Sequence, residues 1–296
     1  MSTKQTGILT RTSLSHVALR TPDVGAMAAF YGRHLGLEPE PGASASEGTR
    51  QAGFEGGVRL GFGLGHHALE LVQGSAGLEH IGFEVLDAGG HEAVAERQRD
   101  HGIAVRELGD DAGTLEVVDP DGNIVQLQGA VSRTGEHTAD SGRRPLRVQH
   151  ATLSTHDMEP MVDFYLGLGF QISDRMGEVF TWLRSTVEHH SLAIVNGSTS
   201  GGLDHYSWDL SEWEDFKTWA DRLTDNGLKI EWGPGRHGPG GNLFLFVDDP
   251  DGNHIELSAE MERFFDDRAS YQTRVWEPGP ATVNLWGGQV PTWRRA

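Results

Sequence analysis

The chain has 296 residues, 37% of them hydrophobic, which is enough for two domains of ordinary size that each bury a core. Its net charge of −19, from 24 basic and 43 acidic residues, argues against nucleic acid or an anionic membrane surface as a partner. The absence of cysteine excludes disulfides, thiolate metal ligands and a cysteine nucleophile. No signal-peptide core and no apolar run of about 18 residues occurs, so we expect a cytoplasmic protein without a membrane span.

The two halves of the chain repeat one another. The first half opens with SLSHVALRTPD and the second with RVQHATLSTHD, which places His16 and His150 134 residues apart. Further along, LEHIGFEV parallels LDHYSWDL, and here His80 and His205 are 125 residues apart. DPDGN occurs in both halves, followed by IVQLQ in the first and by HIELS in the second. Repetition over this length indicates a duplicated domain.

Each half is predicted to fold in the order strand, helix, strands, helix, strands. The segment VQHATL alternates with a period of two, which puts His150 and Thr152 on one face of a strand. MEPMVDFYLGLGF has the spacing of an amphipathic helix that ends at a glycine. The Asp-Gly pair of DPDGN is typical of a tight turn before a last strand. Both halves therefore combine helices with strands.

The limits of the repeat suggest how the chain is divided. We expect four segments, namely an N-terminal domain without metal at 1–131, a linker at 132–147, a C-terminal metal-binding domain at 148–261 and a tail at 262–296. The tail lies outside the repeat and carries Trp276, Trp286 and Trp293. These aromatic residues would serve as a lid over a site or as a contact in a homo-oligomer.

Three polar residues of the second half stand at alternating positions of predicted strands: His150, His205 and Glu256. A lone strand histidine is more often a core residue than a ligand, but three matched positions of a repeat favour ligands. Two histidines and one carboxylate on one sheet face form the facial triad of non-haem Fe(II) oxygenases. The equivalent residues of the first half are His16, His80 and Gln126. Because an amide is a poor substitute for a carboxylate, we expect metal only in the second half.

The segment GPGRHGPGGNLFLFVDDPDGNHIEL at 233–257, with NLWGGQVPTW in the tail, carries a family resemblance. The chain resembles the type I extradiol catechol dioxygenases of the vicinal oxygen chelate superfamily, above all the homoprotocatechuate 2,3-dioxygenase branch. The resemblance covers the whole chain. It implies an α+β fold of two tandem vicinal oxygen chelate domains, each a pair of βαβββ modules that form a curved mixed sheet cup.

The resemblance also implies roles for individual residues. It implies a metal triad at His150, His205 and Glu256, an acid–base histidine at His190 with His189 as the rival, a second active-site histidine at His237, and an aromatic pocket residue at Trp182. The alternative for His190 and His237 is an ordinary surface position in a loop. Thr152 shares the strand face of the triad and is a further candidate substrate contact.

Two departures from the family pattern bear on the substrate. Phe246 stands where the family usually has a tyrosine, so a phenol that could bind a substrate oxygen is missing. Trp232 stands where the homoprotocatechuate branch has an arginine that binds a substrate carboxylate. We therefore expect a neutral or apolar catechol, in contact with Trp232 and Phe246. Arg236 or Arg274 would reverse this expectation if either pointed into the site.

The resemblance implies cleavage of the C–C bond beside a catechol diol by O2, which gives a hydroxymuconic semialdehyde-type product. Fe(II) is the expected metal, and Mn(II) suits the same ligands. Two alternatives remain at this point. One is a glyoxalase-like isomerase or a hydrolase of the same superfamily, and the other is a protein that binds an aromatic ligand without catalysis.

Overall fold

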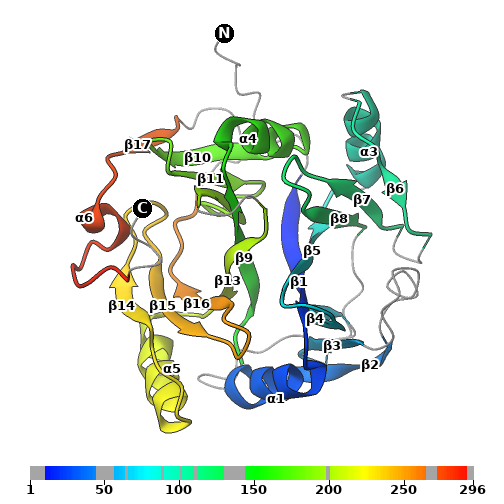
Figure 1. Ribbon diagram of the computed structural model, residues 1–296. Coiled ribbons are helices and arrows are strands. Elements are labelled where there is room, and N and C mark those ends of the chain that lie inside the picture. Colours follow the sequence, from blue (N-terminus) through cyan, green and yellow to red (C-terminus); the bar gives the residue numbers. More distant parts are fainter. Residues whose placement is uncertain are drawn as a thin grey trace.

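The computed structural model describes residues 11–44, 57–63, 66–87, 90–100, 102–109, 113–129, 144–197, 201–264 and 272–291. Most of the predicted linker and Trp293 of the tail lie outside these residues. Within them, no helix is both long and apolar enough to cross a bilayer. The described chain forms two mixed sheets with helices packed around them (Figure 1).

The N-terminal sheet has eight strands in the order β2-β3-β4-β1-β5-β8-β7-β6. Its strands are β1 (Thr12–Thr21), β2 (Glu38–Ser44), β3 (Gly57–Gly61), β4 (His67–Gln73), β5 (Gly77–Val85), β6 (Arg106–Glu107), β7 (Leu115–Val118) and β8 (Ile124–Gln128). Its helices are α1 (Val24–Leu35) and α3 (Gly90–Asp100). This sheet contains both histidines of the first half that the repeat singles out.

The C-terminal sheet has nine strands in the order β14-β15-β16-β13-β9-β12-β11-β10-β17. Its strands are β9 (Arg147–Thr155), β10 (Gln171–Met176), β11 (Phe180–Arg184), β12 (Leu192–Asn196), β13 (Leu203–Asp209), β14 (Trp232–Arg236), β15 (Leu243–Asp248), β16 (His254–Ala259) and β17 (Arg274–Trp276). Its helices are α4 (Met158–Gly167), α5 (Trp213–Asp225) and α6 (Pro280–Val283). The ninth strand, β17, comes from the tail and pairs with β10 in parallel.

Both sheets are built from two βαβββ modules. In the first, β1 pairs with β4 and β5 with β8, each pair in parallel, while β1 and β5 join the modules as antiparallel neighbours. In the second, β9 pairs with β12 and β13 with β16 in parallel, and β9 and β13 are the antiparallel neighbours. The expected α+β fold of two tandem domains, each a pair of βαβββ modules, is confirmed.

Helix α1 illustrates how local sequence sets the ends of an element. Asp23 caps the first turn, because its carboxylate accepts a hydrogen bond from the backbone N–H of Ala26 at 2.9 Å. The helix ends at Gly36, whose φ of 69° lies in the left-handed region that glycine adopts without strain. Its buried face includes Tyr31, whose hydroxyl reaches the other domain.

Two reciprocal hydrogen bonds join the domains. The hydroxyl of Tyr31 on α1 donates to Oδ2 of Asp249 at 2.6 Å, and that of Tyr165 on α4 donates to Oδ2 of Asp119 at 3.0 Å. Each aspartate is the first residue of a DPDGN turn. Helices α1 and α4 lie at opposite ends of the domain junction (Figure 1). Since one apolar cluster also includes residues of both sheets, the domains share a core.

Candidate active site

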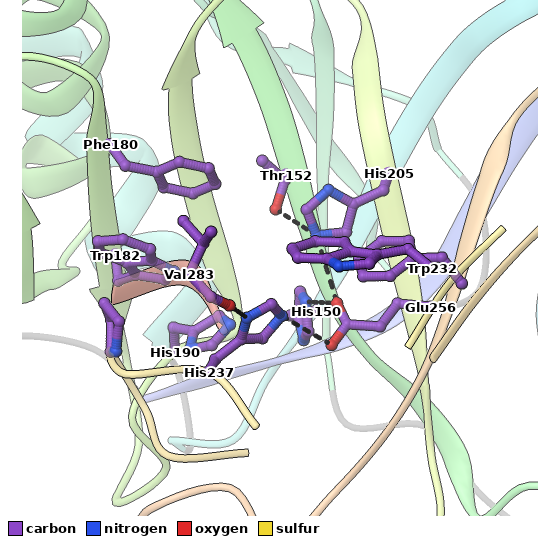
Figure 2. A pocket seen from close by; sticks show the side chains of 12 residues that line it. His150, Thr152, Phe180, Trp182, His190, His205, Trp232, His237, Glu256 and Val283 are labelled. Carbon is purple, nitrogen blue, oxygen red and sulfur yellow. Dashed lines mark hydrogen bonds and ion pairs between the residues drawn. The ribbon is translucent and has the colours of Figure 1, made fainter. Parts of the chain in front are cut away.

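Three side chains from neighbouring strands meet on one face of the C-terminal sheet (Figure 2). His150 lies on β9, His205 on β13 and Glu256 on β16, and the strand register aligns Ser207 of β13 with both His150 and Glu256. From Oε2 of Glu256, Nε2 of His150 is 3.1 Å away and Nε2 of His205 is 3.4 Å away. All three side chains are buried, and their ligand atoms lie within 4.8 Å of one another. One cation at their centre is within reach of all three.

The far side of each imidazole is held by an acceptor. Nδ1 of His150 lies 3.2 Å from Oε1 of Gln149, and Nδ1 of His205 lies 2.5 Å from Oδ1 of Asp204. An acceptor at Nδ1 leaves Nε2 as the ring nitrogen that faces Glu256, and this is the nitrogen that a metal at the centre would bind. The two rings are therefore oriented as metal ligands.

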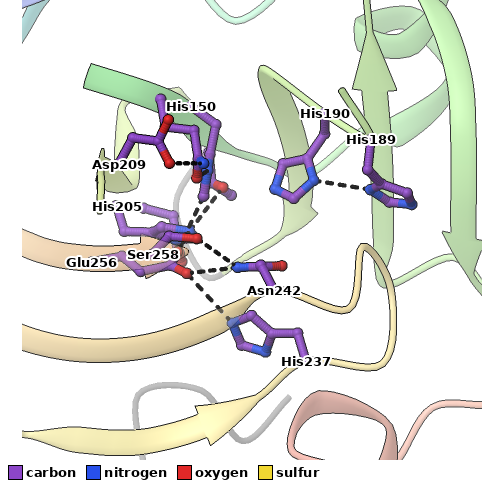
Figure 3. Close-up of polar contacts among 12 residues, drawn as sticks. His150, His189, His190, His205, Asp209, His237, Asn242, Glu256 and Ser258 are labelled. Carbon is purple, nitrogen blue, oxygen red and sulfur yellow. Dashed lines mark hydrogen bonds and ion pairs between the residues drawn. The ribbon is translucent and has the colours of Figure 1, made fainter. Parts of the chain in front are cut away.

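Glu256 supplies the negative charge of the site. Burial by itself would raise the pKa of Glu256, but the charge of His150 and hydrogen bonds from both histidines outweigh it and hold the pKa well below its usual range. Nδ2 of Asn242 also donates to Oε1 of Glu256 at 3.1 Å (Figure 3). One ionised carboxylate with two imidazoles in a buried place fits a divalent first-row transition metal.

His190 faces the triad and is backed by a buried polar chain (Figure 3). Its ring centroid lies 4.4 Å from that of His150, and its Nδ1 lies 2.9 Å from Nδ1 of His189. Nε2 of His189 in turn lies 3.1 Å from Oδ2 of Asp174. With a proton between His189 and Asp174, Nδ1 of His189 accepts from His190, which leaves the Nε2 lone pair of His190 free. Burial, followed by the charges of neighbouring histidines, lowers the pKa of His190 well below its usual range.

His237 approaches the triad from the loop after β14. Its Nδ1 donates to the backbone carbonyl of Val283 at 2.6 Å, so its Nε2 is directed toward Glu256, 3.7 Å from Oε1. Its ring stacks on Phe244, with centroids 3.9 Å apart and an interplanar angle of 11°. Since Val283 belongs to α6, the tail fixes the orientation of this histidine.

Aromatic walls flank the space between these polar groups, which forms a pocket open to solvent on one part of its surface. Phe180 and Trp182 stack at 4.4 Å on one side, and Trp232 lies across from them (Figure 2). Trp232 stacks on Phe246 at 5.3 Å. The lining residues are His150, Thr152, Phe180, Trp182, His190, His205, Trp232, His237, Pro239, Phe246, Glu256 and Val283. A small planar ring fits this combination of metal ligands and apolar walls.

The two arginines considered as substrate contacts are engaged elsewhere. Arg236 donates to the carbonyl of Gly241 and to Oε2 of Glu260, each at 2.6 Å. Arg274 donates from Nε to Oδ1 of Asp174 at 2.9 Å and also pairs with Glu262. Neither arginine is among the residues that line the pocket, and the lining includes no lysine. The structure thus brings every predicted site residue together except these two.

Several residues that act through the ligands were missed by sequence reasoning. Gln149 and Asp204 had a local signal, because each directly precedes a ligand histidine. The sequence offers His189 as a rival of His190, whereas in the structure it lies behind that residue as its partner. Asp174 and Asn242 had no signal, since only strand pairing brings them near the site.

The sequence profile of one family matches both halves of the chain. This family is the Glyoxalase/Bleomycin resistance protein/Dioxygenase superfamily, and the matches span residues 13–127 and 147–257. Among curated relatives, "Metapyrocatechase 2" of Cupriavidus necator is 28% identical, with 94% of this chain and 90% of the relative covered. "Iron-dependent extradiol dioxygenase" of Rhodococcus jostii is 29% identical, with 93% of this chain and 96% of the relative covered.

Solved structures show the same fold. The Mn(II)-bound glyoxalase from Novosphingobium aromaticivorans superposes with a TM-score of 0.82 at 26% identity, covering 94% of this chain and 92% of the other. Homoprotocatechuate 2,3-dioxygenase from Arthrobacter globiformis superposes with a TM-score of 0.81 at 21% identity, covering 98% of this chain and 92% of the other. Both likenesses extend over the two domains.

Proposed function

The chain belongs to the Glyoxalase/Bleomycin resistance protein/Dioxygenase superfamily, and from this premise we propose that it is an extradiol dioxygenase acting on a catechol-type compound. The observation that carries the proposal is the pairing of a buried His150, His205 and Glu256 triad with His190, which lies beside it in an aromatic-lined pocket. Curated relatives named as a metapyrocatechase and an extradiol dioxygenase support it.

The triad would hold the metal. We propose Fe(II), with Mn(II) as a substitute, because two imidazoles and one carboxylate with open positions suit either ion. When bound there, such an ion supplies attachment points for the two diol oxygens and for dioxygen. Gln149 and Asp204 keep the ligand rings in place, and Asn242 keeps the carboxylate in place.

His190 would act as the acid–base residue. Its Nε2 lone pair is available, because Nδ1 is bound to His189, and its lowered pKa keeps the ring neutral before substrate enters. Nε2 can therefore take a proton from a catechol hydroxyl and return it later in the cycle. Asp174 stabilises the positive charge that the His189–His190 pair would gain in that step.

His237 would orient the substrate. Its Nδ1 is fixed on Val283, so Nε2 can exchange a hydrogen bond with a substrate oxygen. Phe246 has no hydroxyl, and its ring lies 5.3 Å from that of His205, so His237 and Thr152 are the nearby polar contacts left for the substrate. Trp182 and Trp232 would hold the two faces of the ring by stacking.

We propose a neutral or apolar substituent on the catechol. A carboxylate on the substrate would need a cation, and the guanidinium groups of Arg236 and Arg274 are bound to protein carboxylates. The pocket instead offers Phe180, Trp182 and Val283, against which an alkyl or aryl group could pack. Val283 comes from the tail, which supports a lid role for that segment. A homo-oligomer stays a prediction, which sedimentation velocity would test.

Oxygen uptake by anaerobically purified, Fe(II)-loaded protein tests the proposal. Catechol, alkylcatechols and 2,3-dihydroxybiphenyl should give uptake and a yellow ring-opened product, whereas 3,4-dihydroxyphenylacetate should react poorly. If 3,4-dihydroxyphenylacetate were the best substrate, this would contradict the proposal of a neutral substituent. It would not contradict the proposal of ring cleavage. No uptake with any catechol, despite bound iron, would contradict ring cleavage itself.

One alternative has a specific observation in its favour. The Mn(II)-bound glyoxalase is 26% identical and has the same fold, so a metal-dependent isomerase is the second candidate. Conversion of a hemithioacetal without oxygen uptake would favour it. Tight binding of an aromatic compound without turnover and without bound metal would favour a purely binding role instead.

A further inference from the structure

The N-terminal domain contains a second buried cluster of two histidines and one carboxylate. His16 comes from β1, His80 from β5 and Glu70 from β4, which are neighbouring strands of the first sheet. One ligand atom from each lies within 4.8 Å of the other two, as is also true of the C-terminal triad. All three side chains are buried. The donor set is again two imidazoles and one carboxylate.

The carboxylate of this cluster comes from a strand that the repeat did not indicate. Gln126 on β8 is the counterpart of Glu256, since it aligns with Gly82 of β5 as Glu256 aligns with Ser207 of β13. Glu70 lies instead on β4, across β1 from β5, where it aligns with Ala18. The first domain thus places a carboxylate on the other side of its two histidines.

The corresponding place in the second domain has no carboxylate. In the register of β9 with β12, Thr152 aligns with Ala193, as Ala18 aligns with Glu70 in the first domain. Each domain therefore carries one carboxylate next to its paired histidines, on β4 in the first and on β16 in the second. The first domain thus has Gln126 where the second has Glu256, and Glu70 where the second has Ala193.

The orientation of His16 is set as in a metal site. Its Nδ1 lies 2.9 Å from Oγ of Ser15, which donates its own proton to the carbonyl of Gly82 at 2.9 Å. Oγ of Ser15 is therefore an acceptor for Nδ1–H, and Nε2 of His16 is left with its lone pair. Ser15 precedes His16 as Gln149 precedes His150, so both domains hold the first histidine through the residue before it.

The separation of the two rings matches shared coordination. Nε2 of His16 and Nε2 of His80 are 2.9 Å apart. Two nitrogens that each lie about 2.1 Å from one ion at a right angle are about 3.0 Å apart. The alternative is a direct hydrogen bond between two neutral imidazoles. Glu70 lies close to both rings and supplies the negative charge that a cation requires. This arrangement favours a shared ion over a hydrogen bond between the two imidazoles.

The guanidinium of Arg59 and the imidazole of His67 also approach Glu70. Nε of Arg59 lies 3.5 Å and Nε2 of His67 lies 3.7 Å from Oε2 of this carboxylate. A carboxylate has two oxygens, so one can face a guanidinium while the other faces an ion. Arg59 would then hold Glu70 in place as Asn242 holds Glu256.

Gly82 makes room for the ring of His16. A Cβ at this position would lie 2.0 Å from Cε1 of His16, so any side chain there would displace the imidazole. The aligned residue of the second domain is Ser207, opposite His150. The glycine therefore permits the ring of His16 to lie over β5, the strand that also carries His80.

We propose that His16, Glu70 and His80 bind a second divalent first-row transition-metal ion. This replaces the expectation, drawn from Gln126 alone, that the N-terminal domain is without metal. The ion would tie β4, β1 and β5 together at the centre of the first sheet. The proposal does not depend on ring cleavage, because it concerns a separate domain and a separate set of ligands.

Metal stoichiometry of the full-length chain tests it. Equilibrium dialysis against Co(II) without oxygen, followed by metal analysis, should give close to two ions per chain for the unaltered protein. Glu70→Gln should give close to one, and Gln126→Ala should still give two. One ion in the unaltered protein, an unchanged count in Glu70→Gln, or loss of an ion in Gln126→Ala would each overturn the proposal.

A second variant and a direct measurement cover the case in which Glu70→Gln fails to fold. Gly82→Ser retains all three ligand residues but displaces the ring of His16, so it should also reduce the count to one ion. Crystals of the unaltered chain grown with Mn(II) should show an anomalous peak between His16, Glu70 and His80. A peak at the C-terminal triad alone would overturn the proposal and leave the proposed catalytic centre intact.

Discussion

The two domains share a backbone plan and differ in where they place one carboxylate. In the C-terminal domain Glu256 lies on β16, beside an aromatic pocket and His190. In the N-terminal domain Gln126 occupies the matching position, and the acid is Glu70 on β4. The difference teaches that a duplicated sheet can keep its two histidines and relocate the third donor, because strands on both sides of the central pair face the same centre.

Exchange of the acid at the two matching positions should have the largest effect. Glu256→Gln should reduce ring cleavage more than about 1,000-fold, because the lost charge stabilisation is several kcal/mol and each 1.4 kcal/mol is about tenfold. Oxygen uptake and bound iron would be measured together. Gln126→Glu, the reverse change in the first domain, should leave turnover as it is. Retained cleavage in Glu256→Gln would remove this carboxylate from the proposed triad.

Loss of the proposed acid–base residue, His190, should have the second-largest effect on turnover. His190→Asn should lower kcat by about 100- to 10,000-fold while bound iron stays the same, since general acid–base catalysis contributes that much. Stopped-flow absorbance of the yellow product would give the rate. His254→Asn is the matched control, because His254 pairs with Asp248 at 2.7 Å and does not line the pocket. Equal losses in both variants would indicate a general structural effect.

Substitution of the residue before the second histidine should affect metal binding differently in the two domains. Asp204→Ala should weaken metal binding at the triad by about 10- to 100-fold, because it removes the acceptor on Nδ1 of His205. Glu79→Ala, the matching change before His80, should have no such effect, since Glu79 accepts from Arg20 at 3.0 Å. Competition with a chromophoric chelator would measure both. Similar losses in the two variants would contradict the assigned role of Asp204.

The reciprocal hydrogen bonds between the domains should give the smallest effect. Tyr165→Phe should lower the free energy of unfolding by about 1.5–3 kcal/mol, as expected for a hydrogen bond to a charged acceptor. Tyr31→Phe should cost more, because the hydroxyl of Tyr31 also accepts from Tyr206 at 2.6 Å. Urea denaturation would compare the two. A larger loss of unfolding free energy in Tyr165→Phe than in Tyr31→Phe would contradict this prediction.

Much of the C-terminal site could be predicted because its signals are local. Alternation in VQHATL put His150 and Thr152 on one strand face, and the repeat supplied His205 and Glu256. The same reasoning does not indicate Glu70 in the first domain, because it compares only the strands that match in the repeat. Glu70 is the fourth residue of β4, and nothing in the local sequence pattern marks it as a metal ligand.

Three features follow from the chain alone, namely the duplication, the α+β modules and the residues that meet across β9, β13 and β16. Periodicity and repetition are properties of a single chain segment, so they can be read without knowing which strands are neighbours. Only the tertiary structure decided that Glu70 joins His16 and His80, that His189 links His190 to Asp174, and that Val283 reaches His237. These contacts depend on strand order and register, which bring together residues far apart in the chain. Tertiary packing is therefore what distinguishes the two centres of this protein.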